Sequence, residues 1–79
     1  MTVKFIVSNG KVYFGDRHYS DDYHSDVAAR AGVRGVVGGG LADMEKRRIF
    51  GTSYGFGPYN PTQLKDILPD WQIECPSSY

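Results

Sequence analysis

Glycine is the residue that most restricts what this chain can fold into. Ten of the 79 residues are glycine, and six of them fall in two clusters, the run Gly38 to Gly40 and the segment Gly51 to Gly57. Glycine loses more backbone entropy on folding than any other residue, so a small domain should keep it for turns or for close approach to a ligand. The two clusters are therefore the first guide to function.

The short chain limits how the fold can be stabilised. A core of this size is expected to supply roughly 3 to 5 kcal/mol. Cys75 is the single cysteine, so no disulfide forms within one chain, and the two histidines add too few ligands for a structural zinc site. Self-association remains as a source of stability, and we expect a homo-oligomer.

Charge and hydropathy exclude several classes of partner. Nine Lys and Arg balance nine Asp and Glu, whereas a nucleic-acid binder normally carries a basic excess. No apolar run approaches the roughly 20 residues that span a bilayer, and the first seven residues lack the apolar region of a signal peptide. We expect a cytoplasmic protein that binds neither a nucleic-acid polymer nor a membrane.

The pattern of apolar residues and turn residues predicts an α+β domain over residues 1–79. Strands are expected over 3–7 and 11–14, joined by an Asn-Gly hairpin turn, and over 33–37, 48–52 and 71–75. Gly38 to Gly40 are expected to break the third strand. The strands predict a single curved mixed sheet of about five strands.

Two helices are expected to accompany this sheet. Ser20 is suited to cap the first, which Gly32 ends, and Pro61 opens the second, which Pro69 ends. His24 is then expected one turn into the first helix. There the positive end of the helix dipole favours the neutral imidazole that a nucleophile or base needs, although nearby aspartates act against it and a surface histidine without a role is the alternative.

The segment Gly51 to Pro58 is the strongest candidate for a binding site. It begins like the nucleophile elbow of the α/β-hydrolases, but that elbow needs a large parallel sheet and a histidine after the serine, and both histidines precede Ser53. A serine among glycines after a strand offers a hydroxyl and backbone N–H groups suited to phosphate or another anion. A tight turn without a ligand would use the same residue types.

Taken in order, these features resemble the phosphohistidine phosphatase family, the Janus and Ocnus proteins. The matching features span nearly the whole chain: Lys4 in an early strand, Tyr23 to Val27 around His24, Val37 to Gly40, Gly51 to Pro58, and Leu68 to Ile73. The resemblance implies the fold of that family and phosphohydrolase chemistry that needs neither a metal nor a cofactor.

The resemblance also implies roles for individual residues. His24 takes the place of the catalytic histidine, which attacks phosphorus or activates water, and Lys4 takes the place of the phosphate-binding lysine. Ser53, with the backbone amides of Tyr54 and Gly55, matches the loop that holds the phosphate oxygens.

The chain departs from the family at its phosphate-binding arginines. Directly after Gly40, which we include in the expected phosphate site, the family carries an arginine and this chain carries Leu41. The second family arginine has Arg17 as its nearest counterpart, and Arg47 or Arg48 are candidates to compensate. Loss of cationic donors weakens stabilisation of the transition state more than it weakens binding of a phosphate.

Three functions remain open at this point. The first is a metal-independent phosphatase or phosphodiesterase that binds a phosphorylated small molecule and uses His24. The second is a non-catalytic protein that sequesters such a ligand, in the manner of viral proteins that hold a nucleotide immune signal in the host cytoplasm. It rests on the missing arginine and on three rings expected around the loop, Tyr54, Phe56 and Tyr59, which could stack on a base or could pack against the second helix. The third is an inert relative with a vestigial pocket.

Overall fold

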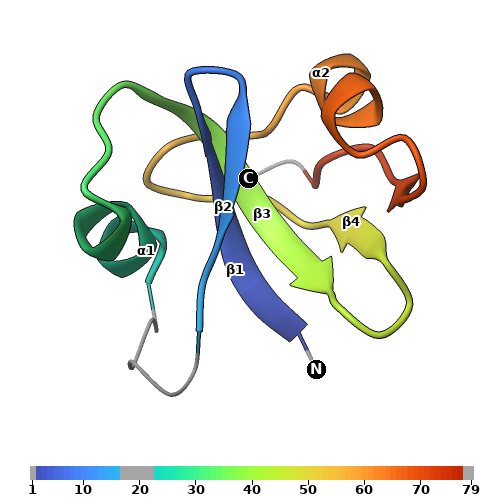
Figure 1. The fold of residues 1–79 in the computed structure, drawn as a ribbon, viewed down its shortest axis with the longest axis horizontal. Coiled ribbons are helices and arrows are strands. Elements are labelled where there is room, and N and C mark those ends of the chain that lie inside the picture. Colours follow the sequence, from blue (N-terminus) through green and yellow to red (C-terminus); the bar gives the residue numbers. More distant parts are fainter. Residues whose placement is uncertain (1, 17–22, 78–79) are drawn as a thin grey trace.

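One mixed sheet and two helices make up the described part of the chain, residues 2–16 and 23–77 of a computed structural model (Figure 1). The sheet has five strands in the order β2-β1-β3-β4-β5, and all neighbouring strands are antiparallel except β4 and β5, which are parallel. This confirms the expected α+β class with a single mixed sheet. In chain order the elements are β1 (Thr2–Ser8), β2 (Lys11–Phe14), α1 (His24–Ala31), β3 (Val36–Asp43), β4 (Arg48–Phe50), α2 (Pro61–Ile67) and β5 (Gln72–Ile73).

The hairpin of β1 and β2 forms where the Asn-Gly pair predicts it. The two strands pair antiparallel with Ser8 opposite Lys11. The two turn residues, Asn9 and Gly10, have φ values of 53° and 73°. Positive φ at both positions matches the twist of the flanking strands, which explains why this pair specifies the turn.

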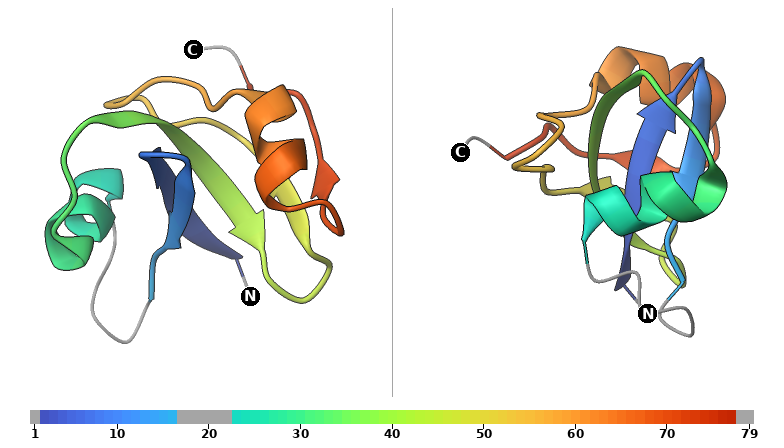
Figure 2. Two further views of the ribbon diagram at one scale, coloured as in Figure 1. Left: turned by 45° about the horizontal axis from the view of Figure 1, so that its top comes forward. Right: turned by 90° about the vertical axis from the view of Figure 1, so that its left-hand side faces the viewer.

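The alternation of β1 separates two hydrophobic clusters on opposite faces of the sheet. Phe5 and its neighbours two positions away belong to the larger cluster, which includes Leu64 of α2. Ile6 belongs to the smaller cluster with Val27 of α1. In the left view of Figure 2 the two helices accordingly lie on either side of the central strands. Because side chains alternate between the two faces along a strand, Lys4 lies on the same face as Ile6, which is the face that carries α1.

The glycine run lies inside β3, so the expectation that it breaks the third strand is wrong. A Cβ atom at Gly38, Gly39 or Gly40 would lie 2.5 to 2.7 Å from a backbone oxygen, which belongs to Pro58, Phe5 or Phe50 respectively. Real Cβ atoms essentially never approach another atom so closely. The three glycines are therefore explained by close backbone packing within a strand rather than by a turn.

Helix α1 begins at His24, later than expected, and the expected cap Ser20 lies outside the described residues. Tyr23 is the N-cap, with extended backbone, and its N–H donates to the carboxylate of Asp26 at 3.0 Å. Gly32 ends the helix as expected, with a left-handed φ of 68°. His24 is thus the first residue of α1 and not one turn into it, so that prediction is wrong.

The C-terminal elements follow the expected order with shorter strands. Pro61 opens α2, and Asn60 caps it by accepting two backbone N–H groups at 2.9 and 3.3 Å. Strand β4 ends at Phe50 because the next residue, Gly51, has a φ of 75° and turns the chain away. Strand β5 is only two residues long. In the described ranges, neither helix has the length and apolar character needed to cross a membrane.

Candidate functional site

A cavity of about 450 Å³ lies where the start of α1 meets the sheet and the segment 51–58, which we call the site loop. Its volume is in the range of about 300 to 1,000 Å³ that small-molecule sites occupy. Four separate parts of the chain contribute to it: β1, the start of α1, β3 and the site loop. The described residues that line it are Lys4, Tyr23, His24, Ser25, Leu41, Thr52, Ser53, Tyr54, Gly55 and Phe56.

The structure thus brings together five of the seven expected site residues. Lys4, His24, Ser53, Tyr54 and Gly55 all line the cavity, although they come from three segments of the chain. The other two expected residues differ. Gly40 contributes only through its backbone, as described below, and Arg17 lies outside the described residues.

Lys4 supplies a cationic group to this cavity. It lies on the α1 face of β1, opposite Leu41 of β3, which also lines the cavity. Within residues 2–16 and 23–77 no carboxylate forms an ion pair with Lys4. A lysine without a protein counter-charge at the wall of a cavity attracts an anionic ligand.

His24 is held against β3 in one tautomer. Its Nε2 lies 2.8 Å from the carbonyl oxygen of Gly40. Because a carbonyl oxygen can only accept, Nε2 carries the proton and donates it, and Nδ1 keeps its lone pair. Gly40 therefore orients the histidine, while its own Cα faces the rings of Phe5 and Tyr59 on the opposite side of the sheet.

The environment of His24 favours the neutral imidazole. Its pKa is lowered, chiefly because the ring is partly buried and desolvated. The charge of Lys4 lowers the pKa further, and the hydrogen bond to Gly40 acts in the opposite direction. At neutral pH the ring is uncharged, which is the state that a nucleophile or general base requires.

This lowered pKa predicts how the stability depends on pH. Between the folded-state pKa of His24 and its ordinary value of 6.5, the unfolded chain binds more protons than the folded chain. The free energy of unfolding therefore rises with pH through this window, and the stabilisation is lost as the pH falls from 6.5 towards the folded-state pKa. Urea unfolding of the wild type and of His24→Gln across that window tests this. We expect a smaller pH dependence in the variant, and equal pH dependence in the two proteins would contradict the buried neutral ring.

The site loop is fixed by its own hydrogen bonds and by β3. The buried Ser53 accepts twice, at Oγ from the N–H of Phe56 (3.1 Å) and at its carbonyl oxygen from the N–H of Gly57 (2.7 Å). Gly57 in turn accepts from the N–H of Gly39 at 3.2 Å. Within the described residues the hydroxyl of Ser53 donates no hydrogen bond, so its own proton is not used there. The N–H of Gly55 donates to no group in the described part of the chain, so it too is available.

Gly39 allows His24 and the site loop to meet. Besides the backbone clash with Phe5, a Cβ at Gly39 would lie 3.1 Å from Cδ2 of His24 and 3.4 Å from Cβ of Ser53. The side chains of His24 and Ser53 therefore approach β3 where a larger residue would carry its Cβ atom. Gly40 was expected in the phosphate site, whereas its neighbour Gly39 supports the site indirectly, by leaving room for these two side chains.

Thr52 is a site residue that the sequence analysis missed. It lines the cavity, only 9% of its surface is exposed, and its Oγ1 has no hydrogen-bond partner among the described residues. Leaving a buried hydroxyl without a partner costs about 1 to 3 kcal/mol. Because Thr52 also lines the cavity, a polar ligand group that reaches this oxygen would remove that cost. The only signal in the sequence was the position of Thr52 beside Ser53 in the glycine-rich segment.

No arginine within the described ranges lines the cavity. Leu41 occupies the wall at the position where the resemblance implies an arginine. Arg48, a candidate to compensate, instead lies 2.8 Å from the carboxylate of Glu74 and over the ring of Phe50. Among the described residues there is also no group of three or more His, Cys, Asp and Glu that could hold a metal ion. Lys4 is therefore the only lysine or arginine that the described residues contribute to the cavity wall.

The three rings expected around the site loop separate in the structure. Tyr59 is buried in the main core, 5.5 Å from Phe5 between ring centroids, and its hydroxyl donates to the carbonyl of Glu74 at 2.6 Å. Burial raises the pKa of Tyr59 to about 12. Of the two alternatives left open for this ring, packing into the core beside α2 is therefore the one that holds. Tyr54 and Phe56 do line the cavity, and Tyr23, which the sequence analysis did not assign to the site, joins them.

Comparisons with known proteins add no relative to this picture: no family model, curated protein or solved structure matches the chain. The resemblance to the phosphohistidine phosphatases rests on the residues quoted for it. Function must therefore be argued from the chemistry of the cavity.

Proposed function

We propose that this protein binds a phosphorylated small molecule in the cavity, with the phosphate between Lys4, His24 and the site loop. The observation that carries the proposal is that Lys4, which forms no ion pair with a described carboxylate, lines the same cavity as Thr52, whose buried hydroxyl has no partner among the described residues. A phosphate oxygen satisfies both groups at once, because it is anionic and accepts several hydrogen bonds. The hydroxyl of Ser53 and the N–H of Gly55 add further donors on the same wall.

His24 gives this site a group that can react with the bound phosphate. In the proposed reaction the lone pair of Nδ1 attacks phosphorus, a P–N bond forms, and the bond from phosphorus to the leaving group breaks. The leaving group takes a proton from a water molecule, which leaves hydroxide. The hydroxide then attacks phosphorus on the phosphorylated ring, the P–N bond breaks, and inorganic phosphate and the neutral imidazole are released. The hydrogen bond from Nε2 to Gly40 determines which ring nitrogen reacts.

Sequestration without turnover is the second candidate, and Leu41 is the observation that favours it. Phosphoryl transfer is catalysed mainly by cations and donors that match the charge of the transition state. Here a single lysine lines the cavity within the described residues, and an apolar side chain stands at the position of the family arginine. Such a site retains a phosphate more readily than it hydrolyses one.

Phosphorus NMR separates these two candidates in one experiment. The protein is incubated with phosphohistidine, phenyl phosphate and a cyclic dinucleotide in turn, and calorimetry measures binding of each. Hydrolysis by the wild type predicts inorganic phosphate from phosphohistidine or phenyl phosphate, or a phosphomonoester from the cyclic dinucleotide. Neither product is expected with His24→Ala, while the variant still binds. Sequestration predicts a ligand that binds and is recovered intact. If no phosphorylated compound binds, the proposed function is wrong.

A further inference from the structure

The cavity offers more room than a phosphate group fills. At about 30 Å³ for a water-sized atom, the five heavy atoms of a phosphate displace about 150 Å³. The cavity measures about 450 Å³, so roughly two thirds of it remains for the rest of the ligand. The residues around that space therefore indicate what the phosphate is attached to.

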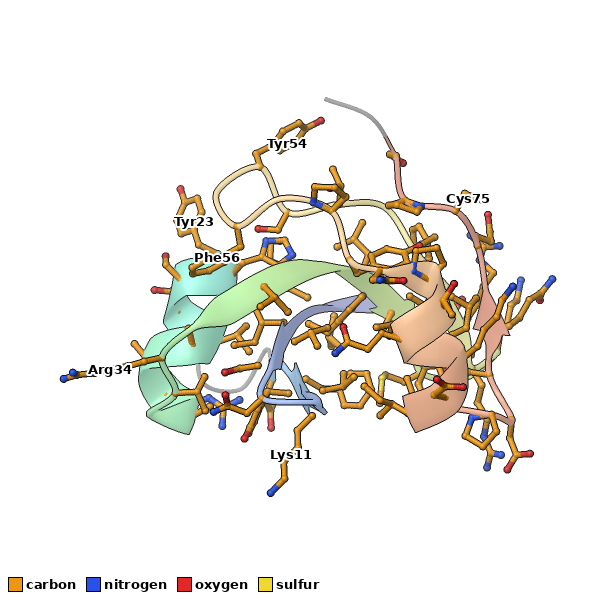
Figure 3. All side chains as sticks on the ribbon, turned by 90° about the horizontal axis from the view of Figure 1, so that it is seen from above. Lys11, Tyr23, Arg34, Tyr54, Phe56 and Cys75 are labelled. Atoms are coloured by element: carbon orange, nitrogen blue, oxygen red, sulfur yellow. The ribbon has the colours of Figure 1, made fainter. Side chains whose placement is uncertain are left out.

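Aromatic rings from two different elements line this remaining space. Tyr23 stands at the N-cap of α1, and Tyr54 and Phe56 belong to the site loop. Figure 3 shows the three rings at the same end of the molecule, with Tyr54 projecting from the tip of the loop and Tyr23 beside Phe56. Phe56 packs against the cluster of Ile6 and Val27 beneath α1, so its position is fixed by the fold.

The two tyrosines have large exposed surfaces. Tyr23 is 69% exposed and Tyr54 is 76% exposed, whereas Tyr59 in the core is 2% exposed. Aromatic side chains normally bury most of their surface, so two exposed rings at the mouth of one cavity mark a place where an apolar or flat group docks. A flat ring covers them best, because stacking uses the π-faces of both partners.

We propose that the ligand is a nucleotide, with its base stacked on Tyr23 and Tyr54 and its phosphate at Lys4, Thr52 and Ser53. The assignment rests on the proposed function, since it requires that the cavity binds the phosphate group of the ligand. A sugar phosphate would leave the tyrosine rings exposed. A nucleoside without phosphate would give no anionic partner to Lys4 or to the hydroxyl of Thr52, which have none among the described residues.

Calorimetry with three probes tests the assignment: AMP, ribose 5-phosphate and inorganic phosphate. We expect AMP to bind at least about 5-fold more tightly than ribose 5-phosphate, which is the lower end of what stacking on one aromatic ring contributes. Tyr54→Ala should remove that advantage, so that AMP and ribose 5-phosphate bind the variant with similar affinity. Tyr54→Phe is the matched control and should keep the advantage of AMP over ribose 5-phosphate, because it keeps the ring. Both variants should fold, since Tyr54 is exposed.

The possible failures are distinguishable. Equal affinity for AMP and ribose 5-phosphate overturns the nucleotide assignment and leaves the phosphate site standing. An AMP affinity that Tyr54→Ala and Tyr23→Ala both leave unchanged overturns it as well. If none of the three probes binds, the proposed function itself is wrong.

Discussion

Replacing Gly39 by alanine is expected to lower the free energy of unfolding by about 1 to 3 kcal/mol, and to displace His24 and Ser53 from their shared position. The added methyl group would lie 2.5 Å from the backbone oxygen of Phe5, in the adjacent strand, which cannot move without breaking the pairing of β1 and β3. A chain of this size has only a few kcal/mol of stability, roughly 3 to 5, so the effect is a large part of the total.

Gly55→Ala is the matched control for this experiment. No atom lies within 4 Å of a Cβ at Gly55, and its backbone does not require positive φ. Its free energy of unfolding should therefore stay within about 0.5 kcal/mol of the wild type, as for other surface substitutions. Urea unfolding followed by circular dichroism measures both variants. A Gly39→Ala protein as stable as Gly55→Ala would show that β3 does not pack as described.

Removal of the Lys4 side chain is the second change with a large expected effect. Lys4→Ala should weaken binding of a phosphorylated ligand by about 10-fold to 100-fold, the range for loss of a hydrogen bond to a charged group. The reason is that no other lysine or arginine of the described residues lines the cavity. The fold should persist, because the larger core lies on the other face of β1.

Lys11→Ala is the control. It removes one positive charge, as Lys4→Ala does, but at a position away from the cavity. Lys11 is exposed at the start of β2, and Figure 3 shows it at the opposite end of the molecule from Tyr54. It should alter affinity little once salt screens the long-range field. Calorimetry at two salt concentrations compares the variants. Equal loss of affinity in both would mean that the net charge, and not the cavity, attracts the ligand.

The parts of the fold that depend on local chemistry were predictable from the sequence. The Asn9-Gly10 pair specifies the first hairpin, and Asn60 with Pro61 specifies the start of α2. The position of the glycine run inside β3 was not predictable in this way. It depends on the backbone oxygens of Phe5, Phe50 and Pro58, which approach the run only in the folded chain.

The site was predictable to the extent that its residues carry recognisable chemistry. Lys4, His24 and Ser53 were all expected there and all line the cavity. Thr52 was missed because its importance comes from burial without a hydrogen-bond partner, which a sequence does not display. The place of Tyr59 stayed open between a ligand and the second helix, because spacing along a loop does not reveal which ring packs into the core.

A titration followed by 1H–15N NMR tests the central claim, that this cavity binds a phosphorylated ligand. AMP is added to the uniformly labelled protein, and inorganic phosphate is used in a parallel titration. With either compound, saturable shift changes are expected at the amides of Lys4 and Thr52 to Gly55 and at the ring nitrogens of His24, and no change at the hairpin turn of Asn9 and Gly10. Absence of saturable changes around the cavity with both compounds, or changes confined to another surface, would contradict the account.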